Sequence, residues 1–377
     1  MKKIVLSGIG TINKGAELML YAILQEIEHK FPDAYVFLPD TVPQGYEYIE
    51  TNLVLKPRFP IWLNKCHIQG VMERLHLPLY NHFVNNNIIK GADYFIDASG
   101  FFFSDQFNLG IEDFDFWSTQ LKEYKQQGTK IVFLPQAFGP IENDFTKKIV
   151  KVINEYSDLI FVREQVSYNY LKSLDIDLNK MKIYPDFTSL VYGIFPTKYE
   201  YIKDRICIIP NENMVEQGII SFEKYVKMLS EIIKICLKFN HKAYLLNHGG
   251  IGDEKIMIAC KSHIGEDIEL VTGLNALEVK GLIGSAYLCI SSRFHGVASS
   301  LNSGVPCLAT SWSHKYKLLF DDFKQQNCIL DMNQQENYLN KIIFMLNGEN
   351  NFSTRELLLK EKQYIVEKTK EMWTNIW

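Results

Sequence analysis

Residues 286–296 read AYLCISSRFHG, and VASSLNSGVP follows at 297–306. The apolar run at the start predicts a buried strand, which ends where the polar residues begin. A helix is expected next, because Gly304 followed by Pro306 is the usual order of residues at a helix C-terminus. A strand, a turn and a helix in this order form the repeating unit of an α/β sheet.

The turn between this strand and helix carries two chemically useful side chains, Arg293 and His295. In open α/β sheets, ligands bind beyond the carboxyl ends of the strands, where helix N-termini offer unpaired N–H groups. An arginine at such a place suits an anionic ligand, and a histidine suits proton transfer. The turn is therefore the first candidate for a functional site.

The same alternation of apolar runs and helix-length segments continues along the chain. Strands are predicted at residues 3–7, 34–38, 94–97, 130–134, 158–162, 205–209, 242–247, 268–271, 287–290 and 306–310. Helices are predicted at residues 15–30, 114–127, 165–174, 222–239, 296–303 and 354–377. Strands separated by helices predict parallel sheets that are covered on both faces.

The length of 377 residues fits two domains of ordinary size better than one core. Prolines interrupt the regular patterns between residues 184 and 203. We therefore predict an N-terminal domain over residues 1–187, a C-terminal domain over 188–350, and a final helix over 351–377 that could pack back on the first domain. The predicted fold class is α/β, with two doubly wound, Rossmann-like domains that face each other across a ligand-binding cleft.

Composition narrows the possible functions. The net charge of −4 argues against nucleic-acid binding. No apolar run approaches the roughly 20 residues of a membrane-spanning helix, and the first residues lack the apolar core of a signal peptide, so a cytoplasmic location is expected. The seven cysteines are scattered and contain no Cys-x-x-Cys pair, which predicts reduced thiols and no zinc site.

The segment from Lys56 to Lys90 is locally basic and contains aromatic residues. Such a segment could rest on an anionic membrane surface, which would place the protein at the inner face of the membrane. The alternative is an ordinary helical excursion with a solvated charged face.

A glycine-rich turn, GIGTINKGAE at residues 8–17, follows the first predicted strand. Its third glycine comes two residues too late for a dinucleotide-binding motif. A ligand could still approach the backbone closely at this helix N-terminus, and the alternative is a tight turn without a ligand. The residues concerned are Gly8, Gly10, Asn13 and Gly15.

Two further loops after predicted strands combine small residues with acids. Ser99 and Gly100 lie in the first loop, together with Asp105. Glu142 lies in the second loop. Either acid could act as a general base, and either could equally cap a helix.

A second arginine, Arg163, stands at a strand end and a helix start. Alone, it could equally be an ion-pair partner on the surface. Together with Arg293 from the other predicted domain, it could bracket a small dianion, because a planar guanidinium group binds carboxylate or phosphate through two hydrogen bonds. His248 and Lys315 are further candidates, and both could equally be structural or solvent-facing.

These motifs together resemble the polysaccharide pyruvyl transferase family, over most of the chain. The most specific element is a Ser-x-Arg-x-His motif, which Ser291, Arg293 and His295 form here. Where the family often has an acid directly after an Asn-x-Gly core, this chain has Ala16 and then Glu17. The remaining elements of the resemblance are Asn13-x-Gly15, Val162-Arg163-Glu164, Tyr184-Pro-Asp186, and either Lys315 or Lys317.

The resemblance implies a two-domain fold like that of glycosyltransferase-B enzymes. It also implies transfer of pyruvate from phosphoenolpyruvate onto two hydroxyls of a sugar, with release of phosphate and formation of a cyclic ketal. The acceptor would be a sugar of a surface polysaccharide or of its lipid-linked precursor. No metal is required, and phosphoenolpyruvate is a donor substrate and not a cofactor.

The same resemblance suggests roles for the candidate residues. His295 would be the acid/base, since an unperturbed histidine has a pKa near 6.5. Arg293 would assist it, and Asp105 or Glu142 would activate the sugar hydroxyl. The donor would contact Arg163, Ser292, Arg293, Phe294, His295 and Lys315. The acceptor side or its loops would include Gly8, Gly10, Asn13, Gly15, Ser99, Gly100 and His248.

Two other readings remain open at this point. A nucleotide-sugar-dependent glycosyltransferase or epimerase of the same architecture would usually carry an acid near the helix after the Arg/His turn, and residues 296–303 contain none. A sugar-binding protein without catalytic activity would release no phosphate with any acceptor.

Overall fold

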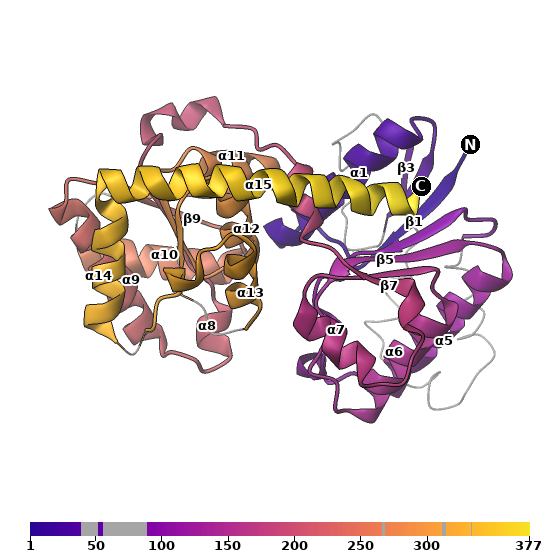
Figure 1. Ribbon diagram of the computed structural model, residues 1–377. Coiled ribbons are helices and arrows are strands. Elements are labelled where there is room, and N and C mark those ends of the chain that lie inside the picture. Colours follow the sequence, from indigo (N-terminus) through magenta and orange to yellow (C-terminus); the bar gives the residue numbers. More distant parts are fainter. Residues whose placement is uncertain (39–51, 56–88, 266–267, 311–313, 333) are drawn as a thin grey trace, which may run out of the picture. The chain divides into compact units, whose positions relative to one another are not determined.

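The computed structural model describes residues 1–38, 52–55, 89–265, 268–310, 314–332 and 334–377. These residues form two compact units (Figure 1). The first unit consists of Met1–Thr11, Ala22–Phe187 and Glu371–Trp377. The second unit consists of Ile12–Tyr21 and Thr188–Lys370.

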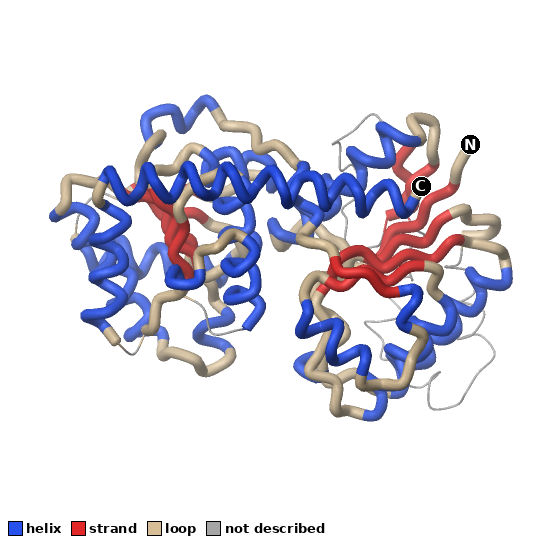
Figure 2. Tube along the Cα trace, viewed as in Figure 1, coloured by secondary structure: helices blue, strands red, loops and turns tan. Residues whose placement is uncertain are grey.

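The first unit contains a parallel sheet with the strand order β3-β2-β1-β4-β5-β6-β7 (Figure 2, red). The strand residues are mostly apolar and fully buried, as expected for a sheet covered on both faces. In Figure 1, α1 lies above this sheet, and α5 and α6 lie below it. The strands are β1 (Lys3–Ser7), β2 (Tyr35–Leu38), β3 (Asn52–Leu55), β4 (Tyr94–Asp97), β5 (Lys130–Gln136), β6 (Leu159–Val162) and β7 (Met181–Ile183). The helices are α1 (Lys14–Lys30), α5 (Ile111–Gln126), α6 (Asp144–Tyr156) and α7 (Gln165–Lys172).

The second unit contains a parallel sheet with the strand order β10-β9-β8-β11-β12. Its core is again built from buried strand residues, from the apolar face of α9 and from buried side chains of α10. The strands are β8 (Ile206–Ile209), β9 (Ala243–Leu246), β10 (Glu269–Val271), β11 (Leu288–Ser291) and β12 (Cys307–Ala309). The helices are α8 (Asn213–Glu216), α9 (Phe222–Lys238), α10 (Ile251–Ile264), α11 (Ala276–Gly284), α12 (Phe294–Asn302), α13 (His314–Asp322), α14 (Gln335–Leu346) and α15 (Gly348–Ile376).

The strand order of each sheet reverses at one point. In the first sheet the order turns between β1 and β4, and in the second between β8 and β11. Ligands of open α/β sheets bind beyond the carboxyl ends of the strands at such a point. The two reversal points therefore indicate where a functional site should be sought.

The α/β fold class with two Rossmann-like units is confirmed, and the predicted strands all exist within two residues of their observed ends. The structure adds elements that the sequence patterns did not predict, among them β3, β7, α6 and α10. Helix α10 was missed because apolar and polar residues are spread around its circumference, which gives no amphipathic pattern.

The division of the chain differs from the predicted three parts at both ends. Residues 12–21 belong to the second unit, although they lie near the N-terminus. Most of α15 also belongs to the second unit, because Arg355 donates to the carbonyls of Ala286 and Tyr287 at 2.6 and 2.8 Å. Only residues 371–377 belong to the first unit, where Trp377 packs against Phe31 with ring centroids 5.4 Å apart.

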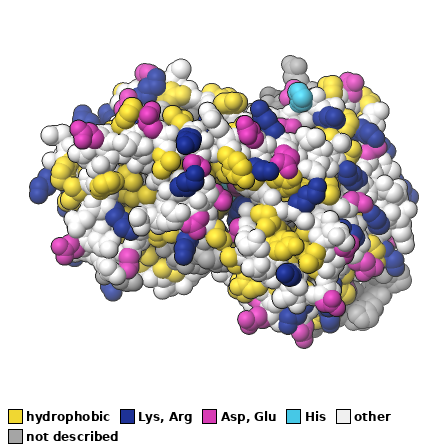
Figure 3. Space-filling view, in the orientation of Figure 1, with side chains coloured by type: hydrophobic (Ala, Val, Ile, Leu, Met, Phe, Trp, Pro, Cys, Tyr) yellow, Lys and Arg dark blue, Asp and Glu magenta, His cyan; other side chains and the backbone are white. Residues whose placement is uncertain are grey.

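The surface carries both positive and negative side chains. Basic and acidic side chains are interspersed over the face seen in Figure 3. None of the helices in the described part of the chain is long and apolar enough to cross a membrane. The basic segment from Lys56 to Lys90 lies almost entirely outside the described residues, so its predicted membrane contact stays a prediction.

Candidate functional site in the second unit

The Arg/His turn lies at the reversal point of the second sheet, directly after β11. Arg293 is the N-cap of α12, and its backbone N–H donates to Oγ of Ser291 at 3.0 Å. Ser292 anchors the turn through its carbonyl, which accepts from Nδ2 of Asn211 at 2.9 Å and from the hydroxyl of Tyr316 at 2.7 Å. The sequence therefore places Arg293 and His295 on a rigid support.

Ser292 and Phe294 hold the turn in place. The Ser292 hydroxyl is buried and hydrogen bonds to the hydroxyls of Tyr225 and Thr310. The Phe294 ring is buried and packs edge to face against Tyr316, with centroids 5.8 Å apart. Both residues were predicted to contact a donor, and in the structure their side chains take part in packing and hydrogen bonding within the unit.

The guanidinium group of Arg293 is oriented by an acid that sequence analysis did not identify. Asp253, in the first turn of α10, has no exposed surface and accepts from Nε of Arg293 at 3.0 Å and also from Nη2. Glu212 lies 3.9 Å from Nη2. Burial, and then the neighbouring Asp253 carboxylate, raise the pKa of Glu212. Asp253 accepts one hydrogen bond from Nε and one from Nη2, so three of the five N–H donors of this guanidinium group are not used by the pair.

Two histidines lie beside this arginine, next to the first turn of α1. The backbone N–H of Lys14 donates to the carbonyl of His248 at 3.3 Å. A Cβ atom added at Gly15 would lie 2.2 Å from Nδ1 of His295, so the imidazole rests directly on the helix backbone. Only glycine permits this approach. The predicted pair Asn13 and Gly15 is therefore brought to His295, with Oδ1 of Asn13 accepting from the N–H of Gly15 at 2.9 Å.

The N-termini of three helices thus meet around Arg293 and His295. Helix α12 begins at Phe294, and α1 contacts His295 through Gly15. Helix α10 approaches through the turn before it, because a Cβ at Gly249 would lie 1.9 Å from Nη2 of Arg293. Each helix N-terminus carries a partial positive charge, although in α1 the N–H groups of Lys14 and Gly15 already donate to His248 and Asn13. The arrangement favours binding of a small anion at this place.

His248 is 3 % exposed, and its Nδ1 atom has no hydrogen-bond partner among the described residues. A buried polar atom without a partner costs about 1–3 kcal/mol, so a ligand or a water molecule is expected to hydrogen bond to it. Burial, and then the charges of Arg293 and His295, lower the pKa of His248 well below its usual value. The His248 imidazole is therefore neutral and can accept a hydrogen bond.

We expect His248→Gln to reduce the loss of stability on acidification. The unfolded chain binds a proton at His248 below about pH 6.5, whereas the native protein does not. The native state therefore loses at most about 1.4 kcal/mol of unfolding free energy per pH unit as the pH falls below that value. Urea unfolding of both proteins at several pH values between neutrality and moderate acid measures the difference.

The exposed His263, at the C-terminal end of α10, provides the control, and His263→Gln should keep the pH dependence of the wild type. Equal slopes for the wild type and His248→Gln would contradict a neutral buried imidazole.

Glu17, whose role the sequence left open, is 2 % exposed. Its carboxylate pairs with Nζ of Lys14 at 2.6 Å and accepts from the hydroxyl of Tyr21 at 3.3 Å. Glu17 therefore stabilises the first turns of α1 from inside the second unit.

The first unit holds the other predicted residues. Gly8 has a positive φ of 72°, and a Cβ there would lie 2.2 Å from Oγ of Ser99, so β1 and β4 approach closely at their reversal point. Ser99 donates through N–H and Oγ to Asp97, which is fully buried and also accepts from Gln136. Burial raises the pKa of Asp97. Gly10 is half-buried, and its contact with the acceptor stays a prediction.

Gly100 supports this loop through its backbone. It has a φ of 69°, and its carbonyl accepts from the N–H of Ala137 at 2.9 Å. Asp105 ties the same loop to the next one, since Oδ2 accepts from the N–H of Glu142 at 2.5 Å. The carboxylate of Asp105 thus links the two loops and does not cap α6, whose N-cap is Asn143, and Glu142 is exposed, so the role of either acid as a general base stays a prediction.

Arg163 is 9 % exposed and follows β6. Its Nε lies 3.6 Å from Glu164, and its Nη1 lies 3.8 Å from Asp186. Arg163 belongs to the first unit and Arg293 to the second, and their joint binding of a dianion stays a prediction. Lys315 lies in the first turn of α13, and its side chain is outside the described part of the chain.

The described residues contain no group of three or more histidine, cysteine, aspartate or glutamate side chains arranged to hold a metal ion. The guanidinium group of Arg293 and the partial positive charge at the helix N-termini suit an organic anion, although Asp253 and Glu212 lie beside the same arginine.

Residues 13–314 match the family described as polysaccharide pyruvyl transferase. The chain belongs to this family. The matched range includes Asn13, Gly15, Arg163, His248, Arg293 and His295.

Solved structures of other proteins share the fold at low sequence identity. Anabaena Alr3699/HepE in complex with UDP and glucose is 11% identical, with a TM-score of 0.61 over 100% of this chain and 98% of that one. The UDP-GlcNAc 2-epimerase of Methanocaldococcus jannaschii is 11% identical, with a TM-score of 0.59 over 93% and 94% of the two chains. That of Neisseria meningitidis, bound to UDP-GlcNAc, is 10% identical, with a TM-score of 0.58 over 98% and 100%. These likenesses show a glycosyltransferase-B-like fold.

Proposed function

We propose that the protein transfers pyruvate from phosphoenolpyruvate onto two hydroxyls of a sugar, in a surface polysaccharide or its lipid-linked precursor. The observation that carries the proposal is the meeting of three helix N-termini around Arg293 and His295. Phosphoenolpyruvate carries a phosphate and a carboxylate, and both suit N–H donors and partial positive charge. Membership in the family supports the reaction type.

In this mechanism Arg293 binds the donor through the N–H groups that Asp253 does not use. A guanidinium oriented in this way loses little freedom when it binds an anion. Because Asp253 offsets much of the charge of Arg293, the partial positive charge at the N-termini of α10 and α12 supplies a large part of the attraction. Arg163 and Lys315 are the proposed additional cations.

His295 would donate a proton to the methylene carbon of phosphoenolpyruvate, which makes the neighbouring carbon electrophilic. The first sugar hydroxyl then adds to that carbon and returns its proton to His295. The C–O bond to phosphate breaks, and the second hydroxyl closes the ketal ring as its proton leaves with the phosphate. His248, neutral and adjacent, would accept a hydrogen bond from a reacting hydroxyl or water.

The direct test is to incubate the full-length protein with phosphoenolpyruvate and candidate lipid-linked sugars. The expected result is release of inorganic phosphate together with a product heavier than the acceptor by pyruvic acid minus water. Phosphate release without the mass gain, or neither with any acceptor, would refute the proposal.

The structural likeness to UDP-binding proteins favours one second candidate, a nucleotide-sugar-dependent glycosyltransferase or epimerase. Helix α12 has no acid in its first turn, which counts against this candidate. Thermal unfolding separates the two, because a ligand at 100 times its Kd stabilises the native state by about 2.7 kcal/mol. We expect stabilisation by phosphoenolpyruvate, and stabilisation only by UDP or UDP-sugars would favour the second candidate.

We expect Arg293→Lys to weaken donor binding by about tenfold or more, since lysine keeps the charge but cannot bind Asp253 and an anion in one plane. The KM for phosphoenolpyruvate measures this effect. An unchanged KM would show that Arg293 does not contact the donor. Lys255→Arg, at an exposed position on α10, is a matched control and should leave KM unchanged.

A further inference from the structure

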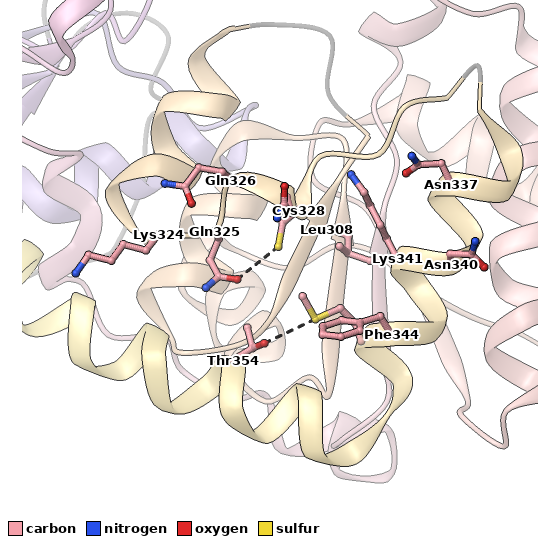
Figure 4. Close-up of a pocket in the computed structure, with 12 residues that line it drawn as sticks. Leu308, Lys324, Gln325, Gln326, Cys328, Asn337, Asn340, Lys341, Phe344 and Thr354 are labelled. Carbon is pink, nitrogen blue, oxygen red and sulfur yellow. Dashed lines mark hydrogen bonds between the residues drawn. The ribbon is translucent and has the colours of Figure 1, made fainter.

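A separate cavity of about 550 Å³ lies in the second unit, between β12, the residues before Cys328, and helices α14 and α15 (Figure 4). It shares no residue with the Arg293 cluster. Its volume falls within the range of roughly 300–1,000 Å³ that is typical of small-molecule sites. The cavity is therefore large enough for an organic ligand.

Carboxamide side chains dominate the polar part of the cavity wall. Figure 4 shows Gln326 on one side and Asn337 and Asn340 on the opposite side, with Leu308 and Cys328 between them. Each carboxamide offers both N–H donors and a carbonyl acceptor. The five carboxamide residues of the wall are Gln325, Gln326, Asn327, Asn337 and Asn340.

The remainder of the wall is apolar. Leu308, Cys328 and Met345 are buried at its base. Phe344 is 54 % exposed, so much of its ring is open to solvent. Burial raises the pKa of Cys328 to about 12, and this thiol stays neutral. The cavity thus combines an apolar floor with a neutral, hydrogen-bonding rim.

The cationic groups of the wall are already engaged. Nζ of Lys324 lies 2.7 Å from Glu361, and Nζ of Lys341 donates to the carbonyl of Ile329 at 2.7 Å. Among the described residues, the wall contains no arginine and no carboxylate. An anion would therefore find no guanidinium fork, although Lys341 keeps its positive charge because its partner is a neutral carbonyl, and a metal ion would find no carboxylate ligand. A lipid chain would bury the carboxamides without partners, which is costly.

We propose that this cavity binds a short neutral oligosaccharide. Sugar hydroxyls both donate and accept hydrogen bonds, as carboxamides do, and the C–H face of a pyranose ring fits against Phe344 and the apolar floor. The proposed site binds the sugar and does not catalyse a reaction on it. It does not depend on the pyruvyl transfer proposed above, although a polysaccharide acceptor could supply such an oligosaccharide.

Saturation-transfer NMR on the full-length protein tests the proposal with lactose, cellobiose, maltotriose and N,N′-diacetylchitobiose at millimolar concentration. We expect at least one of these to bind, and we expect Phe344→Ala and Asn337→Ala each to weaken that binding by about tenfold. Both side chains are exposed, so the two variants should fold as the wild type does.

Matched controls come from exposed residues that do not line the cavity. Phe352→Ala on α15 and Gln126→Ala on α5 should leave the affinity unchanged. Arg293→Lys should also leave it unchanged, which separates this site from the one proposed for pyruvyl transfer. Phosphate release is measured separately, so either proposal can fail alone.

Three outcomes would overturn the inference. The first is that none of the four saccharides binds. The second is binding that Phe344→Ala and Asn337→Ala do not affect. The third is that inorganic phosphate or decanoate, added as anionic and apolar probes, binds at these residues in place of the saccharides.

Discussion

Asp253→Ala is expected to lower the free energy of unfolding by about 3–5 kcal/mol, the usual cost of removing one partner of a buried ion pair. Asp253 has no exposed surface, and it accepts from Nε and Nη2 of Arg293 and from the N–H of Glu212 at 2.9 Å. Alanine would leave a guanidinium group that is 9 % exposed without its counter-ion. Urea unfolding of the purified variant measures the loss.

The neighbouring Glu254 lies in the same helical turn and supplies the control. Glu254→Ala removes an acid from the same helix N-terminus, and we expect it to cost no more than about 1 kcal/mol. A loss for Asp253→Ala that is no larger than this would mean that the pair with Arg293 contributes little.

A double variant isolates the pair from the helix. If the cost of Asp253→Ala comes from the unpaired guanidinium, then Arg293→Met in the same chain should restore part of the lost stability. If the stability losses of Asp253→Ala and Arg293→Met simply add in the double variant, the cost of Asp253→Ala comes instead from the lost hydrogen bond to the backbone N–H of Glu212.

The sequence was most informative where a segment is buried on both faces. Runs such as residues 131–134 and 287–290 are apolar throughout, so their strands could be predicted together with the parallel sheet. Strand β7 was not predicted because its residues Lys182 and Ile183 are exposed, which breaks the apolar pattern. In the first sheet, local sequence therefore predicts the interior strands better than the edge strands β3 and β7.

The site was predicted in part. The positions of Arg293 and His295 at a strand end followed from local pattern, because both lie in one turn. Asp253 lies 40 residues away along the chain, on a helix without an amphipathic pattern. A signal was present in Asn247-His-Gly-Gly250 before it, since a glycine pair after a strand often permits close approach of a ligand or side chain.

The assignment of residues 12–21 to the second unit could not be predicted either. The strand before this segment, β1, pairs with β2 and β4 in the first sheet. Sequence order therefore suggests that all of α1, which comes next along the chain, also belongs to the first unit. The contact of Gly15 with His295 depends on the absence of a side chain at one position. Such a contact joins residues about 280 positions apart, and nothing in a local window of sequence records it.

His295→Gln is expected to lower kcat by roughly 10²–10⁴, the usual contribution of a positioned acid/base, with little change in the KM for phosphoenolpyruvate. Glutamine retains a hydrogen-bonding group of similar size but cannot carry the proton to the methylene carbon. Steady-state release of phosphate with the pyruvylated product as a second readout measures the loss. His263→Gln at an exposed position should keep the kcat of the wild type.

Gly15→Ala is the companion variant, because its Cβ would lie 2.2 Å from Nδ1 of His295 and force the imidazole to move. The helix itself should tolerate alanine, which has a higher helix propensity than glycine. We therefore expect Gly15→Ala to lower kcat while the protein remains folded and Arg293 stays paired with Asp253. If both His295→Gln and Gly15→Ala kept kcat within about tenfold of the wild type, the proton transfer would have to be assigned to another group, and the neutral imidazole of His248 would be the first to test.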